Sequence, residues 1–163
     1  MKKMSTFVLT FISMITLSYL TPIFLLDNKS KPCDNSSIAC SSNSIDKMIN
    51  DKRISNAINK SKYPYTLAAI AKRETGGSFN PQTIGDKGRS YGLYQIQERH
   101  WGKFDKSIEG QTKKAEQILD ELIKEHGYNK AVERYNGSGK QARAYRKDVL
   151  ATVRKLRRID SDG

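Results

Sequence analysis

The stretch Ala68–Gln95, AAIAKRETGGSFNPQTIGDKGRSYGLYQ, begins as a helix and ends as a turn rich in glycine. Leu67, Ile70 and Ala71 precede Glu74 by seven, four and three residues, and this spacing puts all four on one helix face. A carboxylate on an apolar face is either an exception to the pattern or an acid held out of water. Because Gly76-Gly77 ends the helix, we expect Glu74 at the edge of a cleft.

The length and charge of the chain limit its organisation and its partners. A chain of 163 residues holds one ordinary domain and a tail. The formal net charge of +12 predicts affinity for anions. Nucleic acid, an anionic membrane surface and a polyanionic polymer such as a bacterial cell wall all fit that charge.

The N-terminus predicts export. Lys2 and Lys3 precede an apolar run, Met4–Leu26, that has no charged residue and is long enough to span a bilayer. No Ala-x-Ala cleavage site follows. Residues 1–26 are therefore a signal peptide or a signal anchor, and both alternatives stay open. In either case the rest of the chain is expected in the periplasm or cell envelope, and an uncleaved segment would hold it at the cytoplasmic membrane.

A polar linker is predicted over residues 27–43, in which serine and asparagine are abundant. It contains Cys33 and Cys40, which could form a disulfide across a small loop in an oxidising compartment. We expect this segment to be a tether, separate from any catalytic site.

Apolar periodicity predicts a domain over residues 44–158, followed by a short tail at 159–163. Its fold class is mainly α, with five or six helices and an irregular or hairpin-like patch after Glu74. The helical patterns run from Ser44 to Ile58 and over about 65–75, 111–126, 129–135 and 141–158. The segment Ser90–Ile96 is too short to assign as strand or helix.

Glu74 is the candidate for chemistry. Burial against Leu67 and Ile70 would raise the pKa of its carboxyl group and keep it protonated near neutral pH, as a general acid requires. The structural alternative is a glutamate that caps a loop or pairs with a neighbouring base. His100 and His126 have no Cys or carboxylate partners at ligand spacing, so we expect neither a metal nor another cofactor.

Three ordered motifs carry a resemblance to a known family. They are ETGGSFNP at 74–81, GLYQ at 92–95 and RYNG at 134–137. Together they resemble the motifs of the soluble-type lytic transglycosylases, peptidoglycan-cleaving enzymes of the lysozyme superfamily, and the resemblance covers about residues 60–156. Three positions depart from the usual family pattern: Thr75 replaces serine, Tyr94 replaces methionine or phenylalanine, and Arg134 replaces a small residue.

The resemblance implies a lysozyme-like α+β fold and assigns roles to residues. Glu74 would be the catalytic acid and base, and Tyr135 would approach and orient its carboxylate. The residues implied to bind substrate are Thr75, Gln95, Asn136, Tyr91 and Tyr94. The two latter tyrosines could stack on sugar rings or could simply pack, and Tyr135 also fits a core aromatic position.

The reaction implied is cleavage of the β-1,4 bond between N-acetylmuramic acid and N-acetylglucosamine, with formation of 1,6-anhydro-muramic acid. This chemistry needs a single acid, whereas most glycosidases place a second carboxylate across the bond. The nearest candidate for that second carboxylate is Asp86, which a turn also explains; Asp105 and Glu98 are weaker candidates. Hydrolysis, as in goose-type lysozymes or phage lysis enzymes, therefore stays open, as does a non-catalytic wall-binding module.

The expected partners follow from export and from the family. Peptidoglycan glycan strands are the expected substrate, and nucleic acid is not expected outside the cytoplasm. Small members of the family also serve envelope-spanning secretion or conjugation systems, so such an apparatus is a candidate partner. The basic residues of the last helix could be an ordinary solvated face, or could attract peptidoglycan carboxylates or an anionic membrane.

Overall fold

A computed structural model describes residues 43–163, and this part of the chain is mainly helical. The helices are α1 (Asn43–Met48), α2 (Lys52–Asn59), α3 (Pro64–Glu74), α4 (Glu98–Trp101), α5 (Ile108–His126), α6 (Tyr128–Tyr135) and α7 (Gly139–Ser161). Two short strands, β1 (Ile84–Gly85) and β2 (Ser90–Tyr91), pair antiparallel around a 3-10 turn, η1 (Asp86–Gly88). The predicted mainly α fold with a hairpin-like patch after Glu74 is confirmed.

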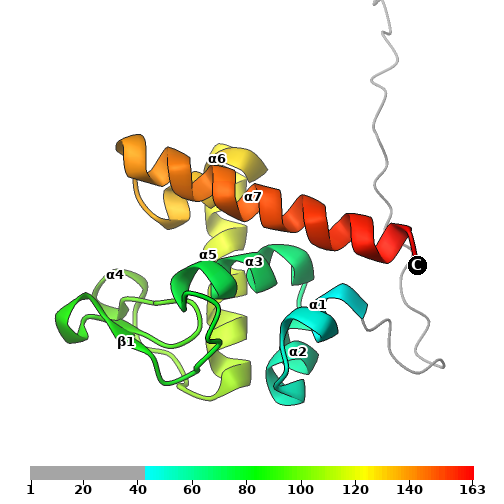
Figure 1. The fold of residues 1–163 in the computed structure, drawn as a ribbon. Helices are drawn as coiled ribbons and strands as arrows, with labels where there is room; N and C mark the ends of the chain where they lie inside the picture. Colours follow the sequence, from blue (N-terminus) through cyan, green and yellow to red (C-terminus); the bar gives the residue numbers. More distant parts are fainter. Residues whose placement is uncertain (1–42) are drawn as a thin grey trace, which may run out of the picture. The chain divides into compact units, whose positions relative to one another are not determined.

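Helix α3 is the centre of the fold, and every residue from Thr66 to Ala71 is buried. It packs against α7 on one side and also contacts α2 and α5 (Figure 1). Pro64 opens the helix, where its missing N–H costs nothing. The small residues Ala68 and Ala69 let neighbouring elements approach closely, so this helix is buried on several sides.

The C-terminus of α3 is closed by a Schellman motif. Gly76 has a φ of +62°, and the N–H of Gly77 donates to the carbonyl of Lys72 at 2.8 Å. The left-handed backbone at this position is inexpensive only for glycine, so Gly76 stops the helix immediately after Glu74 and Thr75. The predicted helix end is therefore confirmed to within one residue.

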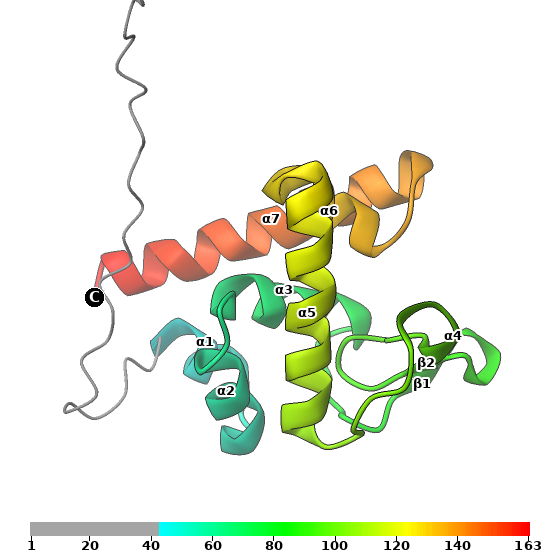
Figure 2. The same cartoon turned by 180° about the vertical axis from the view of Figure 1, so that it is seen from behind.

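The long helices α5 and α7 form the frame around α3. Helix α5 begins at the Ser107 N-cap, whose hydroxyl accepts from the N–H of Gly110, and it ends at Gly127. Its buried residues include Ala115, Ile118 and Leu119. Figure 2 shows α5 running across α3, with α6 joining α5 to α7.

Three boundaries differ from the sequence-based expectation. The helix predicted from Ser44 to Ile58 is two helices, because the Asp51 side chain accepts from the N–H of Arg53 and caps α2 separately. The short helix α4 was not predicted, since four residues carry no periodicity. Helix α7 continues to Ser161 through most of the predicted tail, and Asp160 accepts from the backbone N–H and the hydroxyl of Ser44 at 2.8 Å each.

The hairpin patch is fastened to α5 by one fully buried side chain, Gln111. Its Oε1 accepts from the N–H of Leu93 at 2.8 Å, and its Nε2 donates to the carbonyls of Pro81 and Lys106 at 3.0 and 2.7 Å. A Cβ on Gly92 would lie 2.1 Å from the Gln111 Oε1, so only glycine lets the loop approach.

We predict that Gln111→Ala lowers the free energy of unfolding by about 3 kcal/mol, because it leaves a buried N–H and two carbonyls without this partner. The measurement is urea denaturation followed by circular dichroism. The matched control is Gln117→Ala, an exposed glutamine on the same helix, which should change the free energy by less than about 0.5 kcal/mol. Equal effects of the two substitutions would contradict the role of Gln111.

Candidate functional site

Glu74 is the last residue of α3, and its carboxyl group is largely shielded from solvent by the packing of that helix. Burial raises the pKa of Glu74 above its ordinary value. Two groups act in the opposite direction: the hydroxyl of Tyr145, which donates to Oε1 at 2.7 Å, and the charge of Arg73. A carboxyl group in this setting can hold a proton closer to neutral pH than an exposed glutamate can.

Tyr145 is not among the site residues that the sequence predicted. It lies on the buried face of α7 with 3% of its surface exposed, and α3 packs on that face. The guanidinium of Arg73 lies 5.8 Å from the centre of its ring. Its amphipathic position was visible in the sequence, but a buried tyrosine hydroxyl needs a partner, and that rule could have directed attention to Glu74.

Tyr135, the last residue of α6, forms its hydrogen bond away from the Glu74 carboxyl group. Its hydroxyl donates to the backbone carbonyl of Tyr94 at 3.2 Å. Burial raises the pKa of Tyr135 well above its ordinary value, and the negative charge of Glu74 raises it further. Tyr135 therefore lies close enough to Glu74 for the charge of the carboxylate to shift its pKa. The hydroxyl that donates a hydrogen bond to the carboxyl group belongs to Tyr145.

The residues of the second motif support the loop. Gln95 has a φ of +47°, and its Nε2 donates to the carbonyls of Gly92 and Thr83 at 2.9 and 3.2 Å. A Cβ added to Gly85 would lie only 2.0 Å from the Oε1 of Gln95. The side chain is partly exposed, so it holds the β1–β2 region together and still reaches the surface.

The two tyrosines that were candidates for stacking on sugars differ in exposure. Tyr94 is fully buried, and its hydroxyl is 3.1 Å from that of Thr112, so of the two alternatives Tyr94 fits packing rather than stacking on a sugar. Tyr91 is partly exposed, with the Lys106 amino group 4.6 Å from its ring centre. Tyr91 alone of this pair offers an accessible ring.

Thr75 and Asn136 follow the two helix ends at the site. The Thr75 hydroxyl donates to the carbonyl of Ala71 at 2.7 Å and accepts from the N–H of Phe79 at 3.1 Å, so it shapes the turn after Glu74. Asn136 is exposed next to Tyr135 and is available to a ligand.

Asp86 lies in the exposed 3-10 turn with a φ of +47°. Its carboxylate forms a salt bridge with Arg89 at 2.5 Å and accepts from Nε2 of Gln97 at 3.1 Å. These bonds are those of a turn residue. Asp86 nevertheless belongs to the patch that follows Glu74. Its role as a second carboxylate stays a prediction.

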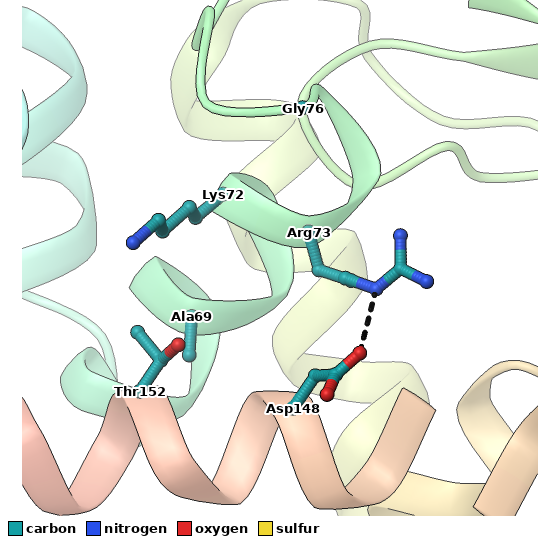
Figure 3. A pocket seen from close by; sticks show the side chains of 6 residues that line it. All are labelled: Ala69, Lys72, Arg73, Gly76, Asp148 and Thr152. Carbon is teal, nitrogen blue, oxygen red and sulfur yellow. Dashed lines mark ion pairs between the residues drawn. The ribbon is translucent and has the colours of Figure 1, made fainter. Parts of the chain in front are cut away.

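A pocket of about 250 Å³ opens between α3 and α7 beside the end of α3 (Figure 3). Its lining residues are Ala69, Lys72, Arg73, Gly76, Asp148 and Thr152, and Arg73 pairs with Asp148 across it at 3.5 Å. By helical spacing, the α3 residues of this pocket lie on a different side of α3 from Glu74. The pocket is therefore not the expected cleft at the carboxyl group.

Several predictions fall on residues 1–42, which lie outside the described part of the chain. They are the signal peptide or anchor, the polar linker and the pairing of Cys33 with Cys40. Among the helices of residues 43–163, none has the length and apolar character needed to cross a membrane.

Comparisons with protein-family models, with curated proteins and with solved structures find no significant match. The functional interpretation therefore depends on the residues and their geometry.

We predict that Tyr145→Phe raises the pKa of Glu74 further, because it removes the hydrogen bond that favours the ionised form. The measurement is an NMR titration of the Glu74 side-chain carbon. Tyr135→Phe is the matched control and should shift this pKa less, because the Tyr135 hydroxyl is bonded to a backbone carbonyl. A larger shift in Tyr135→Phe would restore Tyr135 as the orienting residue.

Proposed function

We propose that the protein is a peptidoglycan lytic transglycosylase with a lysozyme-like fold and that Glu74 is its single catalytic acid and base. The observation that carries the proposal is the position of Glu74: a largely buried carboxyl group with a raised pKa, at the junction of a central helix and a glycine-rich hairpin. The three sequence motifs support it: Glu74 belongs to the first, Tyr135, whose pKa is raised by the Glu74 charge, belongs to the third, and the Tyr94 carbonyl that accepts from Tyr135 belongs to the second.

In the first step, protonated Glu74 would donate its proton to the oxygen between N-acetylmuramic acid and N-acetylglucosamine. The bond from C1 to that oxygen breaks, and the substrate's own N-acetyl group stabilises the positive charge that develops at C1. The Tyr145 hydroxyl, which donates to Glu74 at 2.7 Å, would stabilise the carboxylate that this step creates.

In the second step, the Glu74 carboxylate would accept the proton of the muramic acid O6 hydroxyl. O6 then bonds to C1 and gives the 1,6-anhydro product, and Glu74 is protonated again for the next cycle. One group thus serves as acid and then as base, for which a pKa near the working pH is the best compromise.

We predict that Glu74→Gln abolishes cleavage, with a loss of at least about 1000-fold, because glutamine cannot donate or accept the proton. The measurement is digestion of purified peptidoglycan by the full chain in detergent, followed by mass spectrometry of the muropeptides. Normal cleavage by the variant would refute the assignment of the acid.

The same variant has a control for folding that follows from the pKa. Glu74 has a higher pKa in the folded state than in the unfolded state. Such a carboxyl group makes the free energy of unfolding fall as the pH rises above its ordinary pKa, which is 4.5. Glu74→Gln should therefore be at least as stable as the wild type at pH 7, and this advantage should shrink as the pH falls from the raised pKa of Glu74 towards 4.5. Loss of activity without loss of stability separates chemistry from misfolding.

A variant of Asp86 separates transglycosylation from hydrolysis. If O6 is the nucleophile, Asp86→Asn should retain activity within about tenfold and release anhydro-muramic ends, because no second carboxylate is needed. Reducing ends from the wild type, lost in Asp86→Asn, would instead indicate a hydrolytic muramidase. Undigested wall with retained binding would indicate a wall-binding module.

A further inference from the structure

The outer face of α7 carries a row of basic side chains, here called the α7 stripe. Its members are Lys140, Arg143, Lys147, Arg154 and Arg158, and all five are exposed. Their spacing of three, four, seven and four residues places them on one side of the helix, along about 27 Å. The buried residues of α7, such as Tyr145 and Val149, lie on the opposite side.

The stripe has few acidic neighbours in the described fold: Arg143 is near enough to Glu133 to help lower the pKa of that carboxyl group, but the two form no ion pair. Within residues 43–163, none of the five forms a salt bridge. The two acids within α7 are engaged elsewhere: Asp148 pairs with Arg73, and Asp160 accepts from Ser44 and Tyr65. The stripe therefore presents its charge to solvent.

The chain enters the described fold beside one end of this stripe. Asp160, two residues after Arg158, binds the backbone N–H and the hydroxyl of Ser44. The apolar run Met4–Leu26 precedes this point, and residues 27–42 reach at most about 55 Å when extended. If that run is retained as an anchor, it holds the α7 stripe close to a bilayer, where a tether makes weak contacts effective.

We propose that the α7 stripe docks on an anionic phospholipid surface, with the phosphodiester groups of lipids such as phosphatidylglycerol as its ligands. Arginine and lysine form charge-assisted hydrogen bonds with such groups, and a straight row of five can meet a planar surface together. The entry of the chain at the end of the stripe favours a membrane over a free anionic polymer.

Docking of the stripe would also orient the site. Helix α3 packs on the inner face of α7, and Figures 1 and 2 both place α3 on one side of that helix. Tyr145 reaches Glu74 from that inner face. A stripe on the membrane therefore leaves Glu74 on the side of α7 away from the lipid, and the benefit of this orientation for reaching peptidoglycan rests on the proposed function.

The test is lysine protection in nanodiscs that hold the full chain. One set contains an equal mixture of phosphatidylglycerol and phosphatidylcholine, and the other contains phosphatidylcholine alone. Acetylation rates are read by mass spectrometry at Lys140 and Lys147, with Lys103, Lys113 and Lys124 as exposed references outside α7. We expect both stripe lysines to react at least about fivefold more slowly in the anionic discs, and about 1 M salt should remove this protection.

A triple variant, Arg143→Gln, Arg154→Gln and Arg158→Gln, removes three charges and keeps both reporter lysines. It should lose the protection, whereas Lys60→Gln, Lys87→Gln and Arg99→Gln, three exposed bases outside α7 whose loss changes the net charge equally, should keep it. Circular dichroism checks the helix content of both variants.

Equal rates in the two kinds of disc would overturn the proposal, whatever the variants do. Protection by soluble peptidoglycan fragments in phosphatidylcholine discs, without protection by anionic lipid, would overturn it in favour of a wall polymer. The assay needs no catalysis, and the Glu74→Gln variant should show the same protection. Failure of lipid docking is thus distinguishable from failure of the proposed enzymatic function.

Discussion

The burial of α3 is the constraint on which the described fold and its site depend. A helix buried from Thr66 to Ala71 cannot rotate or shift without exposing apolar surface to water. Its last residue, Glu74, is therefore held on the apolar face even though desolvation of its charge is unfavourable. The free energy gained by packing the helix offsets the cost of burying the acid, and that cost appears as the raised pKa.

Two polar groups then make the neighbourhood of Glu74 specific. Gln111 fixes the hairpin patch to α5 through three hydrogen bonds, so the loop beside the acid has a defined position. Tyr145 fixes the carboxyl group itself. Both side chains are buried with their polar atoms engaged, a state that favours one arrangement because any other leaves polar atoms unsatisfied.

Much of this could be predicted from the sequence, because the informative features are local. The spacing of Leu67, Ile70 and Ala71 before Glu74 predicted both the helix and the acid on its apolar face, and Gly76 predicted where the helix ends. The apolar faces of α5 and α7 were equally clear in the sequence. A periodic pattern determines which residues share a face, but not which residue they contact.

The partners of those faces depend on contacts between distant segments, and the sequence did not predict them. Tyr145 is far from Glu74 in the chain, and nothing in its own helix distinguishes it from a core aromatic. Tyr94 fitted a sugar-stacking position by motif but is buried beside Thr112 on α5. The break before α2 depends on a single cap by Asp51, which competes with an otherwise continuous apolar stripe.

An ion cluster links α6 and α7, the two helices that carry Tyr135 and Tyr145. Glu133, only 2% exposed, pairs with Lys130 on its own helix and with Arg146 on α7 at 2.9 Å. These bases lower the pKa of Glu133 and keep it charged. Because Glu133 precedes Tyr135 by two residues and Arg146 follows Tyr145 directly, the cluster couples the helices that carry both hydroxyls. Removing one partner of such a buried pair is unfavourable, so the pair keeps α6 and α7 together. In this way the cluster restrains Tyr135 and Tyr145 without contacting Glu74.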